Sequence, residues 1–297
     1  MLDRVSFQKP NLSELTQQYT CVDMHYHTEY SDTFTKVENI LKLAKKKKVG
    51  VAITDHNEVR GAIEVSKDKD TFVIPGIEIS CKECPHILVY FYTLSELVEF
   101  FETKVKHRRG GNPWLATTIG TEELFDLLED YNCIAGPAHP VAYPKRFSCM
   151  SQLKADKVNL GVVERFDSIE VINGANIRRM NLKGITWCNH LNKCFHGGSD
   201  GHILRSLGSV VTYAECGQTV DDFLDSIRKK QNYVMGKEMN IPTRLLPYSR
   251  IAGRHLTKYF RPTLLSQYEI SIKRPAVKTA RIIKDTLNSL KEKVKKE

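Results

Sequence analysis

Short β-rich apolar runs alternate with helical patterns along most of this chain of 297 residues, and this alternation constrains the fold more than any other feature. Between Cys21 and about Gly236 there are seven such runs: CVDMHYH, VGVAITDH, TFVIPGIEIS, HILVYFY, NCIAGPAHP, SIEVIN and KCFHGGSDGH. Strands that alternate with helices are typical of α/β folds with a largely parallel sheet. We therefore predict an α/β fold for this part of the chain.

Helical patterns fill several of the connections between these runs. Residues 36–48 carry apolar side chains at helical spacing, which predicts a helix with one face on a sheet: Val37, Ile40, Leu41 and Ala44. We predict Ser95 and Thr121 as the N-caps of two further helices. Residues 176–192 and 219–231 are expected to form two more.

The connection between the third and fourth runs is too short for a parallel crossover. Only residues 81–85 separate the two runs, whereas a parallel crossover needs about a dozen residues or more. The fourth strand should therefore return antiparallel to the third. This arrangement predicts that His86 lies close to Glu78.

Side chains of the kind that bind metals gather at the ends of these predicted strands. His25 and His27 are two residues apart on one strand, so both imidazoles can point toward the same ion. The other candidate ligands follow along the chain: Asp32, His56, Glu78, His86, His139, Asp200 and His202. In α/β barrels and open sheets, the carboxyl ends of the strands carry the chemistry. The nine groups predict a metal site for up to three ions, with some carboxylates bridging.

The order of these motifs resembles the polymerase and histidinol phosphatase (PHP) superfamily. The matching elements are HxH, Asp, Thr-Asp-His, Gly-x-Glu-x-Ser, His, Ala-His-Pro and Gly-Ser-Asp-x-His, between about Cys21 and Glu215. The resemblance implies a distorted (β/α)7 barrel with two to three Mn, Fe or Zn ions. It further implies one ion on His25, His27, Glu78 and Asp200, a second on Glu78, His86 and His139, and a third on Asp32, His56 and His202. Asp55 is expected to support a ligand rather than to bind metal.

The implied activity is hydrolysis of phosphate esters by a metal-bound hydroxide at a trinuclear site. Because metal ions activate water and neutralise phosphoryl oxygens, no catalytic residue is needed apart from the ligands. The sequence contains neither a Gly-x-Ser-x-Gly elbow nor a Walker loop. Arginine forks suit phosphate binding, and three arginines on the loops after two strands are candidates for it: Arg146, Arg178 and Arg179.

Several alternatives to a small-molecule phosphoesterase stay open. A phosphomonoester, a phosphodiester or a nucleotide would each suit the site. A 5′-to-3′ exonuclease of the same superfamily is a second hypothesis, although only 52 residues lie between His86 and His139, where longer members carry an inserted domain. Histidinol phosphatase activity is a third hypothesis. A regulatory protein without activity is a fourth, and the complete ligand set argues against it.

Positive charge is concentrated at the C-terminal end of the chain. Residues 241–297 contain 14 Lys and Arg against 4 Asp and Glu, a net charge of +10, whereas residues 1–240 have a net charge of −1. We divide the chain into a lead-in over residues 1–20, a barrel domain over 21–240, and a basic extension over 241–297 that ends in an amphipathic helix. The extension could dock on the barrel or a protein partner, bind a peripheral membrane surface, or contact nucleic acid.

Composition favours a cytoplasmic protein. No run of about 18 apolar residues is present, and the first residues lack the apolar core of an export signal. The eight cysteines are thinly scattered, so we expect reduced thiols.

Overall fold

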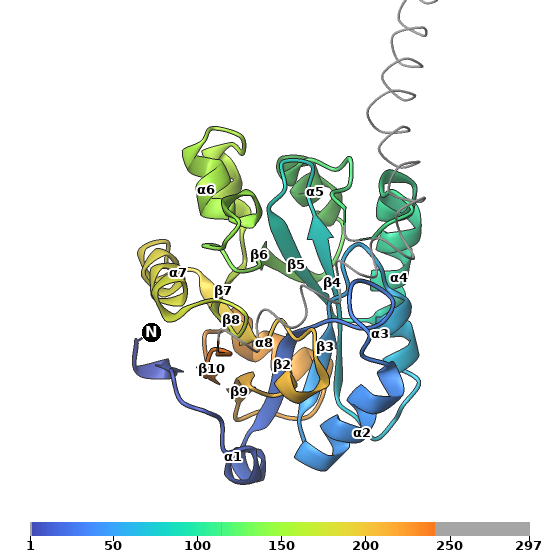
Figure 1. The fold of residues 1–297 in the computed structure, drawn as a ribbon, viewed down its shortest axis with the longest axis vertical. Coiled ribbons are helices and arrows are strands. Elements are labelled where there is room, and N and C mark those ends of the chain that lie inside the picture. Colours follow the sequence, from blue (N-terminus) through green and yellow to red (C-terminus); the bar gives the residue numbers. More distant parts are fainter. Residues whose placement is uncertain (1, 114, 241–297) are drawn as a thin grey trace, which may run out of the picture.

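All seven predicted runs form strands in the computed structural model, which describes residues 2–113 and 115–240 (Figure 1). The strands are β2 (Thr20–Tyr26), β3 (Gly50–Ile53), β4 (Val73–Ser80), β5 (His86–Phe91), β6 (Cys133–Pro137), β7 (Ser168–Asn173) and β8 (Cys194–Gly198). Every residue of β2, β3, β5, β6 and β7 is buried. Such continuous burial explains why these runs are apolar throughout rather than alternating.

In the described residues, four of the eight strand pairs are parallel and four are antiparallel, so the strands are mixed rather than largely parallel as we predicted. Strands β2, β3 and β4 pair in parallel, as do β7 and β8, whereas β5 runs antiparallel to both β4 and β6. Ser80 lies opposite His86 in the β4–β5 pair. The antiparallel return predicted from the five-residue connection is confirmed.

Two sets of backbone contacts close the strands into a barrel. Between β6 and β7, the amide of Asp167 donates a hydrogen bond to the carbonyl of Ala135 (2.8 Å). Between the end of β8 and β2, Gly201 accepts from His27 (3.1 Å) and donates to His25 (3.2 Å). Figure 1 shows β2 to β8 curling around a common centre, with α2, α4 and α7 outside them. The predicted distorted (β/α)7 barrel is confirmed.

Three strands extend the sheet beyond β2, and none of them was predicted from the sequence. They are β1 (Val5–Ser6), β9 (Val210–Ala214) and β10 (Tyr233–Gly236), in the order β1-β10-β9-β2. Two of them have only two and four residues, which is too short for a periodic pattern to stand out. Because β1 pairs with β10, part of the segment that we set apart as a lead-in joins the sheet.

The helices cover the outside of the strands. They are α1 (Leu12–Gln18), α2 (Val37–Lys47), α3 (Arg60–Val65), α4 (Leu94–Phe100), α5 (Thr121–Leu128), α6 (Cys149–Lys154), α7 (Arg178–His190) and α8 (Val220–Arg228). In α2 the buried residues Val37, Ile40 and Ala44 form the predicted apolar face, and they join one core cluster with Val51 and Ile53 of β3. This packing fixes β3, which ends just before His56.

Two predicted helix caps are wrong by one or two residues. Thr93, not Ser95, caps α4, because the Thr93 hydroxyl accepts a hydrogen bond from the amide of Glu96 (3.2 Å). Gly120, not Thr121, precedes α5. Thr121 is instead held by Glu83, whose carboxylate accepts from both its amide and its hydroxyl (2.9 Å each). The hydroxyl of Thr121, which we expected to cap the helix, therefore donates to Glu83, a residue outside the helix.

The structure bears on the expectations about thiols and about membrane-spanning helices. All eight cysteines are free thiols, as predicted. Within residues 2–113 and 115–240, no helix combines the length and the apolar character that a membrane crossing requires. The basic extension over 241–297 and its amphipathic helix lie outside the described residues.

Candidate metal centre

His25 and His27 converge because they occupy alternate positions on β2. Both side chains are fully buried, and their Nε2 atoms lie 3.1 Å apart. Tyr26, between them, points to the other side of the strand, where its hydroxyl donates to the carbonyl of Ile203 (2.9 Å). The alternation of side chains along a strand thus produces a paired imidazole site.

The Glu170 carboxylate sets the protonation of His25. Nδ1 of His25 lies 2.9 Å from Oε1 of Glu170, a buried residue in the middle of β7. An ionised carboxylate only accepts hydrogen bonds, so Nδ1 carries the proton. In the neutral ring, Nε2 then has a free lone pair that faces His27. This is the arrangement that metal-binding histidines usually show.

Two further carboxylates approach the same pair of nitrogens. Oε2 of Glu78 lies 3.4 Å from Nε2 of His25 and 3.4 Å from Nε2 of His27. Oδ1 of Asp200 lies 3.5 Å and 3.2 Å from the same two atoms. Two imidazoles and two carboxylates, from β2, β4 and the loop after β8, therefore surround one point.

The other oxygen of Glu78 faces a second pair of imidazoles. Oε1 lies 3.1 Å from Nδ1 of His86 and 3.4 Å from Nε2 of His139. His86 begins β5 and His139 follows β6, so the antiparallel return of β5 brings His86 to Glu78. Glu78 thus lies between two clusters of nitrogen atoms.

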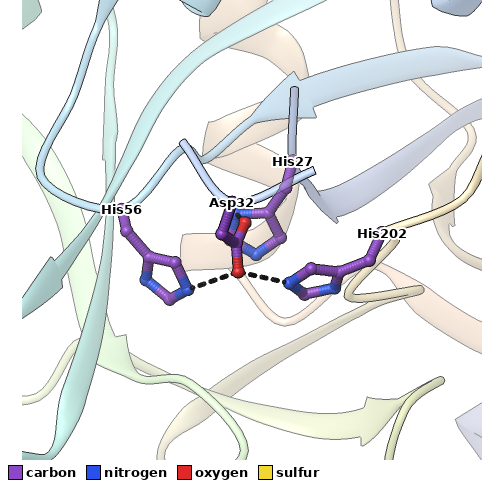
Figure 2. Close-up of side chains that lie close together, drawn as sticks. All are labelled: His27, Asp32, His56 and His202. Carbon is purple, nitrogen blue, oxygen red and sulfur yellow. Dashed lines mark hydrogen bonds and ion pairs between the residues drawn. The ribbon is translucent and has the colours of Figure 1, made fainter. Parts of the chain in front are cut away.

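Asp32 is the centre of a third cluster (Figure 2). Its Oδ2 lies 2.9 Å from Nε2 of His202 and 3.6 Å from Nε2 of His56, and Figure 2 shows it between these two rings with His27 alongside. Nδ1 of His202 lies 2.9 Å from the carbonyl of Asp200. Because a carbonyl accepts only, Nδ1 donates, and a neutral His202 presents the lone pair of Nε2 to Asp32.

The imidazole nitrogens and carboxylate oxygens fit divalent cations. Burial opposes a charge on His25 and His202, but the neighbouring carboxylates outweigh it and raise the pKa of His25 well above its usual range and the pKa of His202 to about 9. Without metal, a proton therefore lies between Nε2 of each ring and the carboxylate oxygens 2.9 to 3.5 Å away, and a metal ion would have to displace it. In addition, two buried ring nitrogens have no hydrogen-bond partner: Nδ1 of His27 and Nδ1 of His139. In three groups of the candidate ligands, each residue brings one ligand atom within 4.8 Å of the others: His27, Asp32, His56 and His202; His25, His27 and Asp200; and His56, Glu78 and His86. His139 is in none of these groups. The donor set, imidazole nitrogen with carboxylate oxygen, suits Zn, Fe and Mn.

The electrostatics of the centre keep its carboxylates ionised. Burial favours the protonated carboxyl of Glu78, but the imidazoles of His56, His25 and His86 outweigh it and hold the pKa of Glu78 well below its usual range. The pKa values of Asp32 and Asp200 are lowered in the same way. The charges concentrated here are those that a metal ion would compensate.

The histidines divide into two kinds. Burial lowers the pKa of His27 to about 4, with His202 adding to the effect. Burial also opposes the charged form of His56, but Glu78 and Asp32 outweigh it and raise the pKa to about 10. His27 is therefore neutral at pH 7, ready to act as a ligand, whereas His56 holds a proton that a metal ion would have to displace.

Two of the candidate ligands have unusual backbone conformations. His139 has φ of 27° and Asp200 has φ of 49°, in the left-handed region that residues with a side chain rarely occupy. Such conformations persist where surrounding contacts hold them, and they are concentrated at functional sites. The amide of His139 donates to Glu170 (2.6 Å), and Asn173 donates to Asp200 (3.2 Å).

Two buried aspartates support the loops that carry the ligands. Asp55 accepts hydrogen bonds from the amide and hydroxyl of Thr28 (2.7 and 2.6 Å) and from the hydroxyl of Ser31 (2.6 Å), which holds the loop that bears Asp32. The supporting role expected for Asp55 matches these contacts. Asp23 accepts from the amides of Ser199 and Gly208 (2.8 Å each) and so ties β2 to the loops around Asp200.

The three candidate arginines lie in different surroundings. Arg146 stacks on Phe147, whose ring lies 4.9 Å from the ring of His86, so this arginine is next to the centre. Arg178 forms two hydrogen bonds with Glu238 (2.7 and 2.9 Å) and stacks on Phe7, which leaves its fork occupied. Arg179 lines a cavity between α6 and α7.

Neither Glu170 nor Asn173 was assigned a role from the sequence. Asn173 donates to both Glu170 (2.9 Å) and Asp200 (3.2 Å), so it links the support of His25 to a candidate ligand. The sequence did hold a signal, because a glutamate inside the apolar run SIEVIN needs a buried partner. Its partners His25 and His139 are 145 and 31 residues away along the chain and become visible only in the fold.

Comparison with known proteins gives sequence matches to parts of the chain and structural matches to most of it. The family described as PHP-associated matches residues 178–232. Two uncharacterized proteins of Methanocaldococcus jannaschii are similar in sequence. One is 32% identical over 128 residues, which cover 40% of this chain and 16% of the relative. The other is 42% identical over 76 residues, which cover 20% of this chain and 44% of the relative. The chain thus spans less than half the length of either relative.

Solved structures share the fold. Endonuclease Q, in complex with a 27-mer duplex that has an abasic lesion at the active site, is similar with a TM-score of 0.58 and 20% identity, over 74% of this chain and 60% of that chain. A two-domain protein of Bacteroides vulgatus that contains a predicted PHP-like metal-dependent phosphoesterase is similar with a TM-score of 0.51 and 15% identity, over 82% of this chain and 72% of that chain.

Proposed function

We propose that this chain, which has the fold of the PHP superfamily, is a metal-dependent phosphoesterase. The observation that carries the proposal is the convergence of six imidazoles and three carboxylates, with Glu78 between the clusters and imidazole nitrogens facing carboxylate oxygens across short distances. We assign one ion to His25, His27, Glu78 and Asp200, a second to Glu78, His86 and His139, and a third to Asp32, His56 and His202. Two to three Mn, Fe or Zn ions would satisfy these donors.

The chain's own residues would each have a distinct part in phosphate ester hydrolysis. Bound divalent ions would supply Lewis acidity toward the phosphoryl group and toward water. Glu170 holds the ring of His25 in place with one carboxylate oxygen and the backbone amide of His139 with the other. Arg146, beside His86 by way of Phe147, would bind a phosphoryl oxygen with its guanidinium fork.

The substrate that this architecture favours is a small phosphate ester or a nucleotide. Between His86 and His139 the described residues form the strands β5 and β6, the helices α4 and α5 and short helical turns, with no further strand among them. A nuclease is the rival hypothesis, since Endonuclease Q shares the fold and acts on a DNA duplex. A substrate panel separates the two.

The test is to strip the protein of metal and to add back Mn, Fe or Zn. We expect elemental analysis of the purified protein to find two to three ions, and the restored protein to hydrolyse p-nitrophenyl phosphate, bis-p-nitrophenyl phosphate or a mononucleotide. Hydrolysis of a duplex with an abasic lesion, without turnover of the small esters, would favour the nuclease. Absence of bound metal together with inactivity under every metal would overturn the proposal.

Glu78 provides the sharpest single substitution. Glu78→Gln keeps the volume but removes the charge that faces five imidazoles, so we expect both metal content and turnover to fall by about tenfold or more. The matched control is Glu38→Gln, an exposed residue on α2. Wild-type activity in Glu78→Gln would contradict the assignment of Glu78 as a bridge.

A further inference from the structure

Asn57 follows directly after the candidate ligand His56, and the backbone leaves the extended conformation at this residue. Its φ is 48°, in the left-handed region, where residues other than glycine are uncommon and asparagine is among the better tolerated. The residue is fully buried, although it is neither a candidate ligand nor part of the apolar core. A buried side-chain amide needs hydrogen-bond partners, and these partners indicate its role.

The backbone around His56 continues the parallel pairing of β3 with β4 beyond the end of β3. His56 forms a parallel bridge with Glu78, which brings its Nδ1 to 3.0 Å from Oε2 of Glu78. The amide of Glu78 donates to the carbonyl of Asp55 (3.3 Å), and the amide of Asn57 donates to the carbonyl of Glu78 (2.9 Å). The next bond in such a ladder would run from the amide of Ser80 to the backbone carbonyl of Asn57.

At this point of the ladder, a side chain takes the place of the backbone. The amide of Ser80 donates to Oδ1 of Asn57 (2.9 Å) instead of to its backbone carbonyl. Because the left-handed conformation ends the extended run at Asn57, the side-chain carbonyl accepts the bond that a further strand residue would have accepted. The hydrogen bonds of Asn57 therefore lie on both sides of Glu78, one on its carbonyl and one on the amide two residues later.

The other end of the Asn57 amide is engaged as well. Nδ2 donates to the carbonyls of Pro113 (2.6 Å) and Leu115 (3.0 Å), on the connection that leads to α5. Two carbonyls need a donor and one amide N–H needs an acceptor, so these three partners fix the orientation of the side-chain amide. The same connection reaches Ser80 through Thr117, whose amide and hydroxyl donate to the Ser80 carbonyl (2.8 and 3.0 Å). Asn57 thus ties the end of β4 and this connection to the residue after His56.

His56 depends on these contacts more than Glu78 does. Glu78 lies inside β4 and is paired on its other side with Leu88 of β5. His56 lies beyond the end of β3, and within residues 2–113 and 115–240 its only strand pairing is the isolated bridge with Glu78. Its Nε2 faces Oδ2 of Asp32 at 3.6 Å (Figure 2). A shift of His56 would therefore first change the site that we assign to the third ion.

We propose that Asn57 is a positioning residue of the metal centre, whose side-chain amide takes the place of a strand carbonyl and so holds His56 in place. The proposal rests on the proposed phosphoesterase function, because it needs metal ions at the candidate ligands. Asn57 itself is not a ligand, since both ends of its amide are bound to backbone groups. The ion that depends on it is the one on Asp32, His56 and His202.

Asn57→Gly is the informative variant. Glycine adopts the left-handed conformation readily, so the turn after His56 is kept while the three hydrogen bonds of the side chain are lost. We expect elemental analysis to find about one ion fewer per chain, or competition with a chelator to show about 10- to 100-fold weaker binding of that ion. Asn192→Gly is the matched control, because it makes the same change at an exposed residue with φ of 51°, and it should leave metal binding unchanged.

A second variant separates positioning from stability. Asn57→Asp keeps an oxygen opposite the amide of Ser80 but loses the N–H donors to Pro113 and Leu115. Both variants should lower the midpoint of thermal unfolding of the metal-free protein, because buried backbone groups lose their partners. Metal content is measured on the folded fraction, where Asn57→Asp should retain most of the metal that Asn57→Gly loses.

The outcomes are distinguishable. If Asn57→Gly is less stable but binds metal as tightly as the wild type, Asn57 is only structural and the proposal is overturned, with the phosphoesterase left standing. Equal loss of metal in Asn57→Gly and Asn57→Asp would also overturn it, since the bond to Ser80 would then have no part in holding His56. A wild-type protein that binds no metal would refute the proposed function and this proposal together.

Discussion

At the scale of single residues, the centre depends on carboxylates that serve two neighbours at once. Glu78 directs one oxygen at His86 and His139 and the other at His25, His27 and His56. Glu170 also contacts two neighbours, since one of its oxygens accepts a hydrogen bond from His25 and the other accepts one from the backbone amide of His139. A change in either carboxylate should therefore affect two clusters together.

Glu170 yields a prediction at this scale. Glu170→Ala removes the acceptor that fixes the proton of His25, so we expect metal affinity to fall by about 10- to 100-fold, measured by competition with a chelator. Glu170→Gln should lose less, because its amide oxygen can still accept one of the hydrogen bonds. Glu164→Gln, an exposed change near the start of the same strand, is the control. If Glu170→Ala binds metal as well as the wild type, Glu170 does not position His25.

Arg146 gives a prediction that separates substrate binding from metal binding. Arg146→Ala should lower kcat/KM for a phosphate ester by about 10- to 100-fold, since it removes a charge-assisted hydrogen bond worth about 1.5–3 kcal/mol. Metal content should stay unchanged. Arg146→Lys should recover part of the loss, because it keeps the charge but not the fork. Loss of metal in Arg146→Ala would instead identify the residue as structural.

At the scale of elements, the barrel depends on close approach of strands at glycines. A side-chain carbon at Gly136 of β6 would lie 1.7 Å from the carbonyl oxygen of Ser168 on β7. At Gly198 of β8, the same carbon would lie 2.3 Å from the backbone nitrogen of His25. Glycine therefore allows β6 to approach β7, and β8 to approach β2, more closely than a residue with a side chain would. In both places the atom in the way belongs to the backbone, so it cannot move aside as a flexible side chain could.

Gly136→Ala should consequently destabilise the fold. We expect the free energy of unfolding to fall by about 1–3 kcal/mol or more, seen as a lower midpoint in thermal or urea unfolding. Gly161→Ala is a matched control, because the nearest atom to its added carbon is the side-chain oxygen of Asn159, at 3.5 Å. Equal stability of the two variants would show that β6 and β7 can separate without cost.

At the scale of the whole molecule, the charge is divided unevenly. The residues up to 240 have a net charge of −1, and the remaining 57 have a net charge of +10. All nine candidate ligands and the cavity between α6 and α7 belong to the first part. Catalysis and the basic extension should therefore be separable.

Deleting residues 275–297 tests that separation. Turnover of a small soluble phosphate ester should stay within a few-fold of the full chain, whereas any binding to anionic vesicles or nucleic acid should weaken and lose its salt dependence. Turnover and binding are measured on the same preparations. A shortened chain that aggregates or melts early would contradict the prediction and assign the extension a structural role by burial of apolar surface.

The sequence by itself predicted seven of the strands and the set of candidate metal ligands. Seven apolar runs predicted β2 to β8, and the five residues between two of them predicted the antiparallel return that brings His86 to Glu78. Both inferences use local rules, namely the alternation of side chains and the length of a connection. Local rules act over a few residues, so a single sequence is sufficient for them.

Only the tertiary structure decided which neighbour each polar side chain meets. The hydrogen bond between Glu170 and His25 joins residues 145 positions apart in the sequence. Arg178 and Glu238 are 60 positions apart, and Glu83 and Thr121 are 38 positions apart. The cavity between α6 and α7 likewise arises from two helices that do not adjoin in the chain. Contacts of this kind depend on how the strands close into a barrel, and the backbone approaches at Gly136 and Gly198 that permit closure leave no periodic pattern in the sequence.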